Sequence, residues 1–415
     1  MAIHRGFFAS IGEADHEVVD LLHRALARLG DVDRPERARL LAILASELTF
    51  TESVERRTEL SDHAIAVARR TGDDGCIAAV MVGRCQALWI PGTHTERLSI
   101  TEELSTLARQ LADPYLEFWA AYYRNAALIE GGNGAGAAVE IARCAELAQV
   151  AGQATTSWVD LFTRAGYEYG RGDLERAEEL ITQSLEAGQR AGYQDAVFLY
   201  GVTLFTIRRE QARLEEIFDL IRVAVDESQL RGIAVMLGVA CADTGRDDEA
   251  EAILDTVAAD DFDDIPPSQI RASILWGAAT LATHLRDEAR AAQLLSLLEP
   301  WPDLLIYQGL ITFGPAAGIL GELSALVGRR DDAERYFAQA IEVTSRAGAA
   351  TLLAQVRTAW ARALLDGGGP DDAARARDLL DQAGAEAERF GLTAIADQVR
   401  ALIERLEAGG KEPQG

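Results

Sequence analysis

The chain has 415 residues, of which 48% are hydrophobic and 26% charged, and its 40 basic against 66 acidic side chains give a formal net charge of -26 at pH 7. This charge disfavours a nucleic-acid or anionic membrane surface, because phosphate binding requires clusters of basic side chains. No apolar stretch approaches the ~20 residues that cross a bilayer, and residues 1–15 lack an apolar core of signal-peptide length. We therefore expect a cytoplasmic protein that binds neither nucleic acid nor membrane.

The residue types exclude several classes of enzyme. The one lysine, Lys411, lies in the polar tail, whereas P-loop NTPases, protein kinases and pyridoxal enzymes each need a lysine in the folded domain. The sequence also contains neither a G-x-S-x-G nor an H-E-x-x-H motif. We predict no catalytic residue and no cofactor.

Two short patterns could hold a ligand, but each has a simpler interpretation. His16, Asp20 and His23 would share one helix face and could bind a metal, although a polar stripe on a terminal helix explains them as well. Glycines 132, 134 and 136 follow no strand, so a turn between helices is favoured over a phosphate loop. We predict no metal site.

The cysteines indicate a reducing compartment. They lie far apart in apolar helical segments and form no C-x-x-C pair, which is typical of buried thiols. The four are Cys76, Cys85, Cys144 and Cys241.

Along the chain, apolar residues recur at helical spacing, and no strand-like alternation is bounded by hairpin turns. The pattern predicts an all-α protein of roughly twenty helices. Dipeptides such as Gly72-Asp73 and Gly172-Asp173 should separate them, because glycine supplies a left-handed C-cap and aspartate an N-cap.

A similar helix-end sequence recurs every 40 residues. This period fits two helices of about 16 residues and two turns, so it predicts a right-handed α-solenoid of about ten stacked helical hairpins. The five matching segments are 68–72, 108–112, 148–152, 188–192 and 228–232.

The repeat breaks twice before it resumes near Gly348 and Gly391. The breaks fall at Pro266-Pro267 and in the proline-rich residues 299–315. We therefore divide the chain into two helical arrays, 1–260 and 261–415, with a disordered tail from about 409. Residues 299–315 could be adapted for binding or be a longer loop without a role.

Two units match the spacing of a tetratricopeptide repeat. Small residues in such a unit let the two helices of a hairpin approach closely, while large ones fill the groove against the next hairpin. The first unit consists of Leu237, Gly238, Cys241, Gly245, Ala250 and Leu254, and the second of Leu320, Gly321, Ser324, Gly328, Ala333, Phe337 and Ala340.

A more particular resemblance rests on four segments, residues 87–89, 204–214, 314–317 and 367–373. With these, most of residues 14–406 resembles the C-terminal helical-repeat region of bacterial signalling ATPases and LuxR-type regulators of the MalT-like class. In that family the repeats follow an NTPase module and serve as a sensor or docking platform. The chain lacks those modules and is either a whole protein or part of a longer regulator, so the resemblance implies a scaffold or sensor and transfers no catalytic residue.

The 40-residue period also predicts which residues recur along the concave surface. Arg84, Arg124 and Arg164 form a ladder that could bind carboxylates or phosphates, because the guanidinium fork suits both. They could instead pair with carboxylates of neighbouring repeats, such as Glu117 or Glu168. An aromatic ladder at 118, 158 and 198 is more typical of core. The candidate binding residues are Arg84, Arg124, Arg164, Trp119, Tyr123, Asn125 and Trp158.

Three functions follow from these patterns. The first is a non-catalytic scaffold or regulatory module of a bacterial signalling pathway, which binds a protein or peptide partner in its concave groove. The second is a sensor that closes on a small anionic metabolite. The third is an enzyme with a pocket in the solenoid. The sequence is also compatible with a homo-oligomer.

Overall fold

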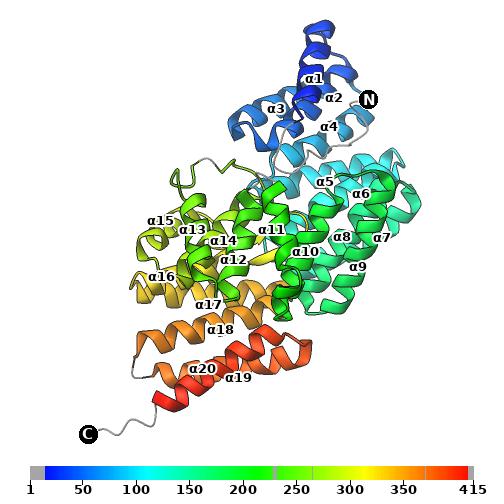
Figure 1. Ribbon diagram of the computed structural model, residues 1–415. Helices are drawn as coiled ribbons and strands as arrows, with labels where there is room; N and C mark the ends of the chain where they lie inside the picture. The colour runs from blue at the N-terminus through cyan, green and yellow to red at the C-terminus, as the bar shows by residue number, and fades with distance from the viewer. Residues whose placement is uncertain (1–14, 228–230, 264, 370, 410–415) are drawn as a thin grey trace.

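The computed structural model describes residues 15–227, 231–263, 265–369 and 371–409 (Figure 1). Within them the chain forms twenty α-helices, two 3-10 helices and two short strands. In chain order these are α1 (His16–Leu29), α2 (Pro35–Glu47), η1 (Leu48–Phe50), α3 (Val54–Thr71), α4 (Asp74–Ala87), α5 (His94–Gln110), α6 (Pro114–Glu130), α7 (Gly134–Ala151), α8 (Ala154–Arg171), α9 (Leu174–Ala191), α10 (Ala196–Glu210), η2 (Leu214–Glu216), α11 (Phe218–Glu227), α12 (Arg231–Asp243), α13 (Asp247–Val257), α14 (Arg271–His284), α15 (Glu288–Leu298), β1 (Leu305–Tyr307), β2 (Thr312–Pro315), α16 (Ala316–Leu326), α17 (Arg330–Ala347), α18 (Ala350–Gly367), α19 (Asp372–Phe390) and α20 (Thr393–Gly409).

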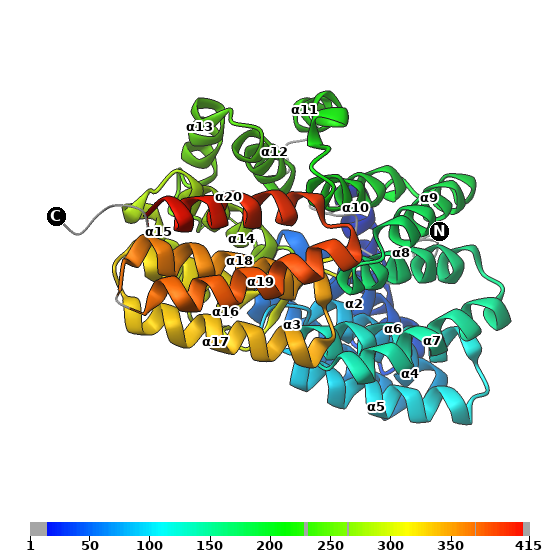
Figure 2. The same cartoon turned by 90° about the horizontal axis from the view of Figure 1, so that it is seen from below.

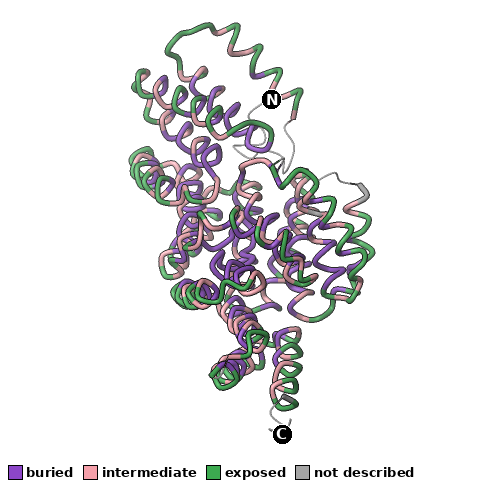
Figure 3. The backbone as a smooth tube through the Cα atoms, turned by 90° about the vertical axis from the view of Figure 1, so that its left-hand side faces the viewer, coloured by how far each residue is buried: buried purple, intermediate pink, exposed green. Residues whose placement is uncertain are grey.

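The helices stack as antiparallel hairpins in two layers. Most helices pack against their neighbours in sequence, and several even-numbered helices also contact the next even-numbered helix, as α12 contacts α14 and α16 contacts α18. The even-numbered helices form the more buried inner layer. In Figure 3 the buried residues, drawn in purple, lie toward the inside of the molecule. The predicted all-α solenoid of helical hairpins is confirmed.

The predicted turn chemistry is present at the helix junctions. Gly72 adopts a left-handed φ of 67° after α3, and the Asp73 carboxylate accepts a hydrogen bond of 2.8 Å from the amide of Cys76. Gly172 and Asp173 repeat the arrangement between α8 and α9. Each dipeptide therefore ends one helix and begins the next.

The fifth predicted helix end is displaced. The chain turns through η2 after α10, so α11 has only ten residues and ends at Glu227. Residues 228–230 lie outside the described residues, and Gly232 falls in the first turn of α12 rather than at a helix end. The 40-residue register is therefore lost one unit earlier than the sequence indicates.

The small residues of the repeat-like units lie where helices approach closely. A Cβ on Gly238 would stand 2.8 Å from the side chain of Leu281, and one on Gly321 would stand 3.0 Å from the Phe337 ring. A side chain at either position would have to displace its neighbour, so glycine allows the close packing of these helices. The two units pack as tetratricopeptide-like hairpins, α12 with α13 and α16 with α17.

The expectation that the chain contains no strand is wrong in one place. β1 and β2 pair as an antiparallel hairpin within residues 299–315, and both strands are buried. They are only three and four residues long, which is too short for an alternating pattern to be visible. The hairpin lies inside the solenoid (Figure 1), where β1 contacts α6 and α14 and β2 contacts α16 to α18.

The second half of the chain folds back onto the first. Arg346 donates hydrogen bonds to the carbonyls of Gly131 and Gly132, and the Thr351 hydroxyl donates to the carbonyl of Tyr169 at 2.8 Å. Figure 2 shows helices α16 to α20 beside α8 and α10, and α18 contacts α8. Inner helices of the two halves therefore contact each other.

One hydrophobic core runs through most of the protein. It extends from Ala78 to Val399 and includes Val257 and Phe262, which lie on the two sides of the predicted array boundary. A smaller core joins α1 to α4. The division into arrays 1–260 and 261–415 stays a prediction, and most of the predicted tail, 410–415, lies outside the described residues.

Two further predictions concern the cysteines and membrane-spanning helices. All four cysteines are buried and free, and burial raises the pKa of the Cys85 thiol to about 12, so they are inert core residues. None of the described helices is both long enough and apolar enough to cross a bilayer.

Candidate functional site: an inner groove

Each arginine of the predicted ladder is paired with a carboxylate. Arg84 on α4 contacts Asp62 and Glu96, which lie on the neighbouring outer helices α3 and α5. Arg124 on α6 lies 3.2 Å from Glu140 on α7, and Arg164 on α8 lies 3.3 Å from Asp160 of the same helix. The carboxylates named as partners from the sequence bind other arginines, Glu117 to Arg143 and Glu168 to Arg171. Arg84 and Arg124 therefore link an inner helix to its outer neighbours, whereas the Arg164 pair lies within α8.

The other candidate residues lie in the core. Trp119, Tyr123 and Asn125 on α6 are fully buried, and Trp158 on α8 stacks on Tyr193 with ring centroids 4.5 Å apart. Neither amide atom of Asn125 has a hydrogen-bond partner among the described residues. The structure thus brings these side chains together between helices and away from the surface. A role for them in partner binding stays a prediction.

A cavity opens elsewhere, on the inner layer. It has a volume of about 530 Å³ and is lined by α10, α12, α14, α16, α18, α20 and β2. A second cavity of about 350 Å³ adjoins it between α14, α16 and α18. The two share the side chains of Thr283, Glu322, Ala359 and Arg362. We call the combined space the inner groove.

Aromatic and aliphatic side chains form the floor of the inner groove. The rings of Trp276 on α14 and Phe313 on β2 lie 5.1 Å apart in the larger cavity. In the smaller cavity Phe337 and Trp360 stack with centroids 5.8 Å apart. An apolar floor with aromatic rings at both ends and polar groups between them is typical of a ligand site. The buried hairpin supplies part of it, so residues 299–315 are a structural element of the groove.

The C-terminal end of α10 brings opposite charges to the groove wall. Arg209 lies 2.5 Å from Asp243 of α12, and its guanidinium stands 5.6 Å from the Trp276 ring centroid. Burial alone would lower the pKa of Arg209, but the Asp243 carboxylate outweighs that effect and raises it. Arg209 is therefore a fixed cation whose charge is already matched within the protein.

Glu210, the next residue, is the most perturbed acid of the groove. Its side chain is 3% exposed, and its Oε1 atom accepts a 2.6 Å hydrogen bond from the amide of Gln355 on α18. Burial raises the pKa of Glu210 to about 7, although Arg209 and Gln355 act in the opposite direction. This contact joins the two halves of the chain across the groove.

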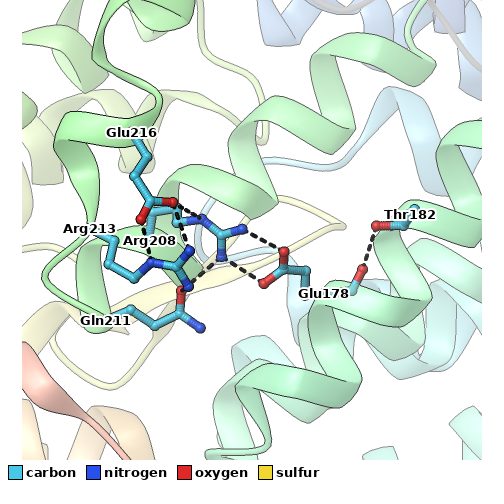
Figure 4. Close-up of polar contacts among 6 residues, drawn as sticks. All are labelled: Glu178, Thr182, Arg208, Gln211, Arg213 and Glu216. Carbon is cyan, nitrogen blue, oxygen red and sulfur yellow. Dashed lines mark hydrogen bonds and ion pairs between the residues drawn. The ribbon is translucent and has the colours of Figure 1, made fainter.

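Arg208 faces away from the groove and holds the end of α10 in place. Its guanidinium forms a two-pronged contact with Glu178 of α9, at 2.5 and 2.6 Å, and a 2.8 Å bond with Gln211 (Figure 4). Arg213 in turn binds Glu216 of η2. The hydrogen bonds from Arg208 hold the pKa of Glu178 below its ordinary value. This network fixes the helix turn that points Arg209 and Glu210 inward.

Most charged side chains of the groove form a close ion pair or hydrogen bond with a described residue, whereas Glu322 and Arg362 interact with each other only at longer range. Glu322 on α16 and Arg362 on α18 form no hydrogen bond or ion pair with any residue that the structure describes. Burial raises the pKa of Glu322, while the nearby Arg362 and Arg209 lower it. The remaining charged groups that line the groove pair as Arg209–Asp243, Glu215–Arg246, His284–Asp247, Arg286–Asp366, Arg330–Asp372, Glu334–Arg375 and Asp397–Arg400, and Glu210 binds Gln355.

Sequence reasoning did not find the groove, although one signal was present. Arg208, Arg209 and Glu210 are three consecutive charges at the end of an otherwise apolar helix. Such a run in a buried helix must be paired or face a cavity. Residues 204–214 and 314–317 also line or support the groove, and both contribute to the resemblance described above. Among the described residues, no three histidines, cysteines or carboxylates come together as metal ligands.

No protein-family model matches the chain, and no curated protein matches it. Among solved structures it is similar to a Rap protein complexed with competence and sporulation factor, at 11% identity and a TM-score of 0.36, over 90% of this chain and 99% of that one. It is also similar to Naa15/Naa10 bound to HypK-THB, at 15% identity and a TM-score of 0.22, over 89% of this chain and 63% of that one. A circular tandem repeat protein gives 17% identity and a TM-score of 0.18, over 94% and 88% of the two chains. The function therefore has to be argued from the groove itself.

Proposed function

We propose that the protein is a non-catalytic scaffold that binds an extended segment of a partner protein in the inner groove. The observation that carries the proposal is the pair of adjoining cavities, about 530 and 350 Å³, which share one wall and run past six inner helices. An elongated groove with an apolar floor suits a peptide chain, whose side chains alternate between floor and rim. The resemblance to MalT-like repeat regions supports a place in bacterial signalling.

The proposal is tested by filling the groove. Thr283 lies on the shared wall, and the substitution Thr283→Trp would place an indole where the two cavities meet. The probe is an immobilised library of random octapeptides. We expect the wild type to retain peptides that protect the amides of α14, α16 and α18 from hydrogen exchange, and Thr283→Trp to retain none.

The matched control is Thr256→Trp. Thr256 is exposed on the outer helix α13 and makes the same hydrogen bond to the carbonyl four residues earlier, as Thr283 does. This variant should retain the same peptides as the wild type. A library that yields no groove-bound peptide, or equal loss in both variants, would refute peptide binding at the groove.

A second candidate function is a sensor that closes on a small molecule. The Glu210–Gln355 hydrogen bond joins α10 to α18 across the larger cavity, so an occupant would touch both halves of the chain. A ligand present at 100 times its dissociation constant should stabilise the fold by about 2.7 kcal/mol. A thermal-shift screen of anionic metabolites that finds no stabilisation would reject this function.

A further inference from the structure

Four residues form a joint where α18 meets α8 and α10. The Gln355 amide on α18 donates a 2.6 Å hydrogen bond to Oε1 of Glu210 on α10. One turn earlier on α18, the Thr351 hydroxyl donates to the carbonyl of Tyr169 on α8 at 2.8 Å. The bonded residues are 145 and 182 positions apart in the sequence. We call these four residues the joint, because their hydrogen bonds hold helices from the two halves of the chain together.

Glu210 is the acid of the joint, and it is nearly removed from water. Its side chain is 3% exposed, although it lines the larger cavity of the inner groove. Arg209, the cation next to it in the sequence, lies 2.5 Å from the Asp243 carboxylate and is already matched by it. Burial penalises the charged form of a carboxyl group, so these surroundings favour the protonated form of Glu210.

The groups that face Glu210 act on its proton in both directions. Hydrogen bonds from Gln355 and Tyr169 and the charge of Arg209 favour the carboxylate, whereas Asp243 opposes it. Burial outweighs the donors and raises the pKa of Glu210 to about 7. Burial also raises the pKa of Tyr169 well above its ordinary value, so the phenol stays neutral. The charged groups on the other elements packed against α10 are paired, as Glu178–Arg208, Glu215–Arg246 and Asp397–Arg400.

Opening of the joint would change the surroundings of Glu210. If α18 moved away from α10, water would reach the carboxyl group and its pKa would fall toward the ordinary value of 4.5. Below pH 4.5 both forms of the joint hold the proton. As the pH rises from 4.5 to 7 only the open form loses it, so the balance shifts toward opening and then stays level.

We infer that the joint is a proton-sensitive clasp, which stays closed while Glu210 is protonated and loosens α18 from α8 and α10 when Glu210 loses its proton. Glu210 and Gln355 both line the larger cavity, so opening of the clasp changes the shape of the inner groove. The inference goes beyond the proposed function, because it holds whatever occupies the groove.

The test is amide hydrogen exchange of the full chain, without peptide, from pH 4.5 to above 7. Exchange rates are divided by the intrinsic rate at each pH to give the opening constant of each segment. For the segment of α18 around Thr351 and Gln355, we expect this constant to rise by up to about 100-fold between pH 4.5 and 7 and then to stay level. The most protected amides elsewhere in the chain should rise less.

Two variants assign the rise to Glu210. Glu210→Gln keeps an acceptor for Gln355 but cannot titrate, so the rise should disappear. Tyr169→Phe removes a donor that favours the carboxylate, so the rise should continue to a higher pH than in the wild type. The second variant keeps the inference testable if the first does not fold.

Two further variants serve as controls. Glu386→Gln removes an acid that contacts α18 through Arg357 within the same half of the chain. His284→Gln removes the histidine of the groove, which pairs with Asp247, because imidazole readily changes charge near neutral pH. Both variants should keep the wild-type rise.

Two results would overturn the clasp. The first is a rise that survives in Glu210→Gln or disappears in a control variant. The second is an equal rise in the most protected amides of the whole chain, since Glu210 would then act on global unfolding alone. Neither result bears on peptide binding, and a library without a groove-bound peptide would refute the proposed function while leaving the clasp in place.

Discussion

The solenoid has a regular half, α4 to α9, and an interrupted half, α10 to α20. The two halves differ in how their charged side chains are paired. From α5 to α9 the helices are 17 or 18 residues long, and the arginines that recur every 40 residues all bind carboxylates of the same or adjacent helices. In the second half α13, α15 and α16 have 11 residues each, and a β-hairpin replaces part of one repeat. There the inner layer lines a groove in which Glu322 and Arg362 interact with each other without forming a close ion pair.

The difference shows where a repeat protein gains a binding site. A residue that recurs in every unit meets the same neighbour each time, so repetition tends to satisfy its charge within the stack. A shortened helix or an inserted hairpin removes that neighbour and leaves space. The recurring arginines thus form ion pairs within the array, and the proposed site lies where the repeat is interrupted.

The largest effect on stability should come from the buried ion pair of the regular half. Arg97 and Glu130 are 0% and 4% exposed and lie 2.5 Å apart, and Glu130 also accepts a hydrogen bond from the Trp89 indole. Arg97→Ala leaves a buried carboxylate without its cation, so we expect a loss of about 3–5 kcal/mol in the free energy of unfolding. Urea denaturation measures it.

The control for this prediction removes both charges. Arg97→Met combined with Glu130→Gln keeps the volume and the acceptor for Trp89 but leaves no unpaired charge. The double variant should be more stable than Arg97→Ala, because replacing a buried pair by neutral groups costs little. Equal losses in the two variants would show that the pair acts through packing rather than charge.

The next effect tests how tightly the hairpin is seated inside the solenoid. A Cβ on Gly166 of α8 would stand only 1.7 Å from the carbonyl oxygen of Leu310, so Gly166→Ala forces the hairpin away from the helix. We expect a loss of about 1–3 kcal/mol, as for overpacked cores. Gly170 on the same helix has nothing within 4 Å of its Cβ position, so Gly170→Ala should gain up to about 1 kcal/mol. Thermal unfolding that shows the same sign for both would contradict this packing.

The pH dependence of stability should test the Glu210–Gln355 hydrogen bond, which joins α10 to α18. Burial raises the pKa of Glu210 to about 7, above the ordinary value of 4.5 that applies in the unfolded chain. Below pH 4.5 the group is protonated in both states. As the pH rises toward 7 only the unfolded chain loses the proton, so stability falls, by on the order of 2 kcal/mol, and then stays level.

Glu210→Gln removes this titration and keeps the acceptor for Gln355. The difference in unfolding free energy between wild type and variant should therefore change between pH 4.5 and 7 in favour of the variant. A difference that is constant across this range would show that Glu210 keeps an ordinary pKa in the folded protein.

The sequence predicts the architecture better than it predicts the site. Helical periodicity and the glycine-aspartate junctions locate most helix ends, because those signals are local. The sequence does not reveal the β-hairpin, since its three- and four-residue strands are held by α6 and α18, which are distant in sequence. The groove cannot be predicted from the sequence for the same reason. It depends on α18 folding back toward α8 and α10, and no spacing within a repeat encodes that contact.

The smallest effects should come from the arginine ladder. Arg84, Arg124 and Arg164 are 16–32% exposed, and their ion pairs are partly open to solvent, so each substitution by glutamine should cost no more than about 1 kcal/mol. Arg176→Gln on α9, which breaks an exposed pair within one helix, gives the baseline. Peptide retention from the octapeptide library should be unchanged in the triple variant, because the ladder binds carboxylates beside the outer helices rather than lining the inner groove. If the triple variant keeps its fold but retains no peptide, the partner binds along the repeated arginines, and the regular half, not the interrupted one, carries the site.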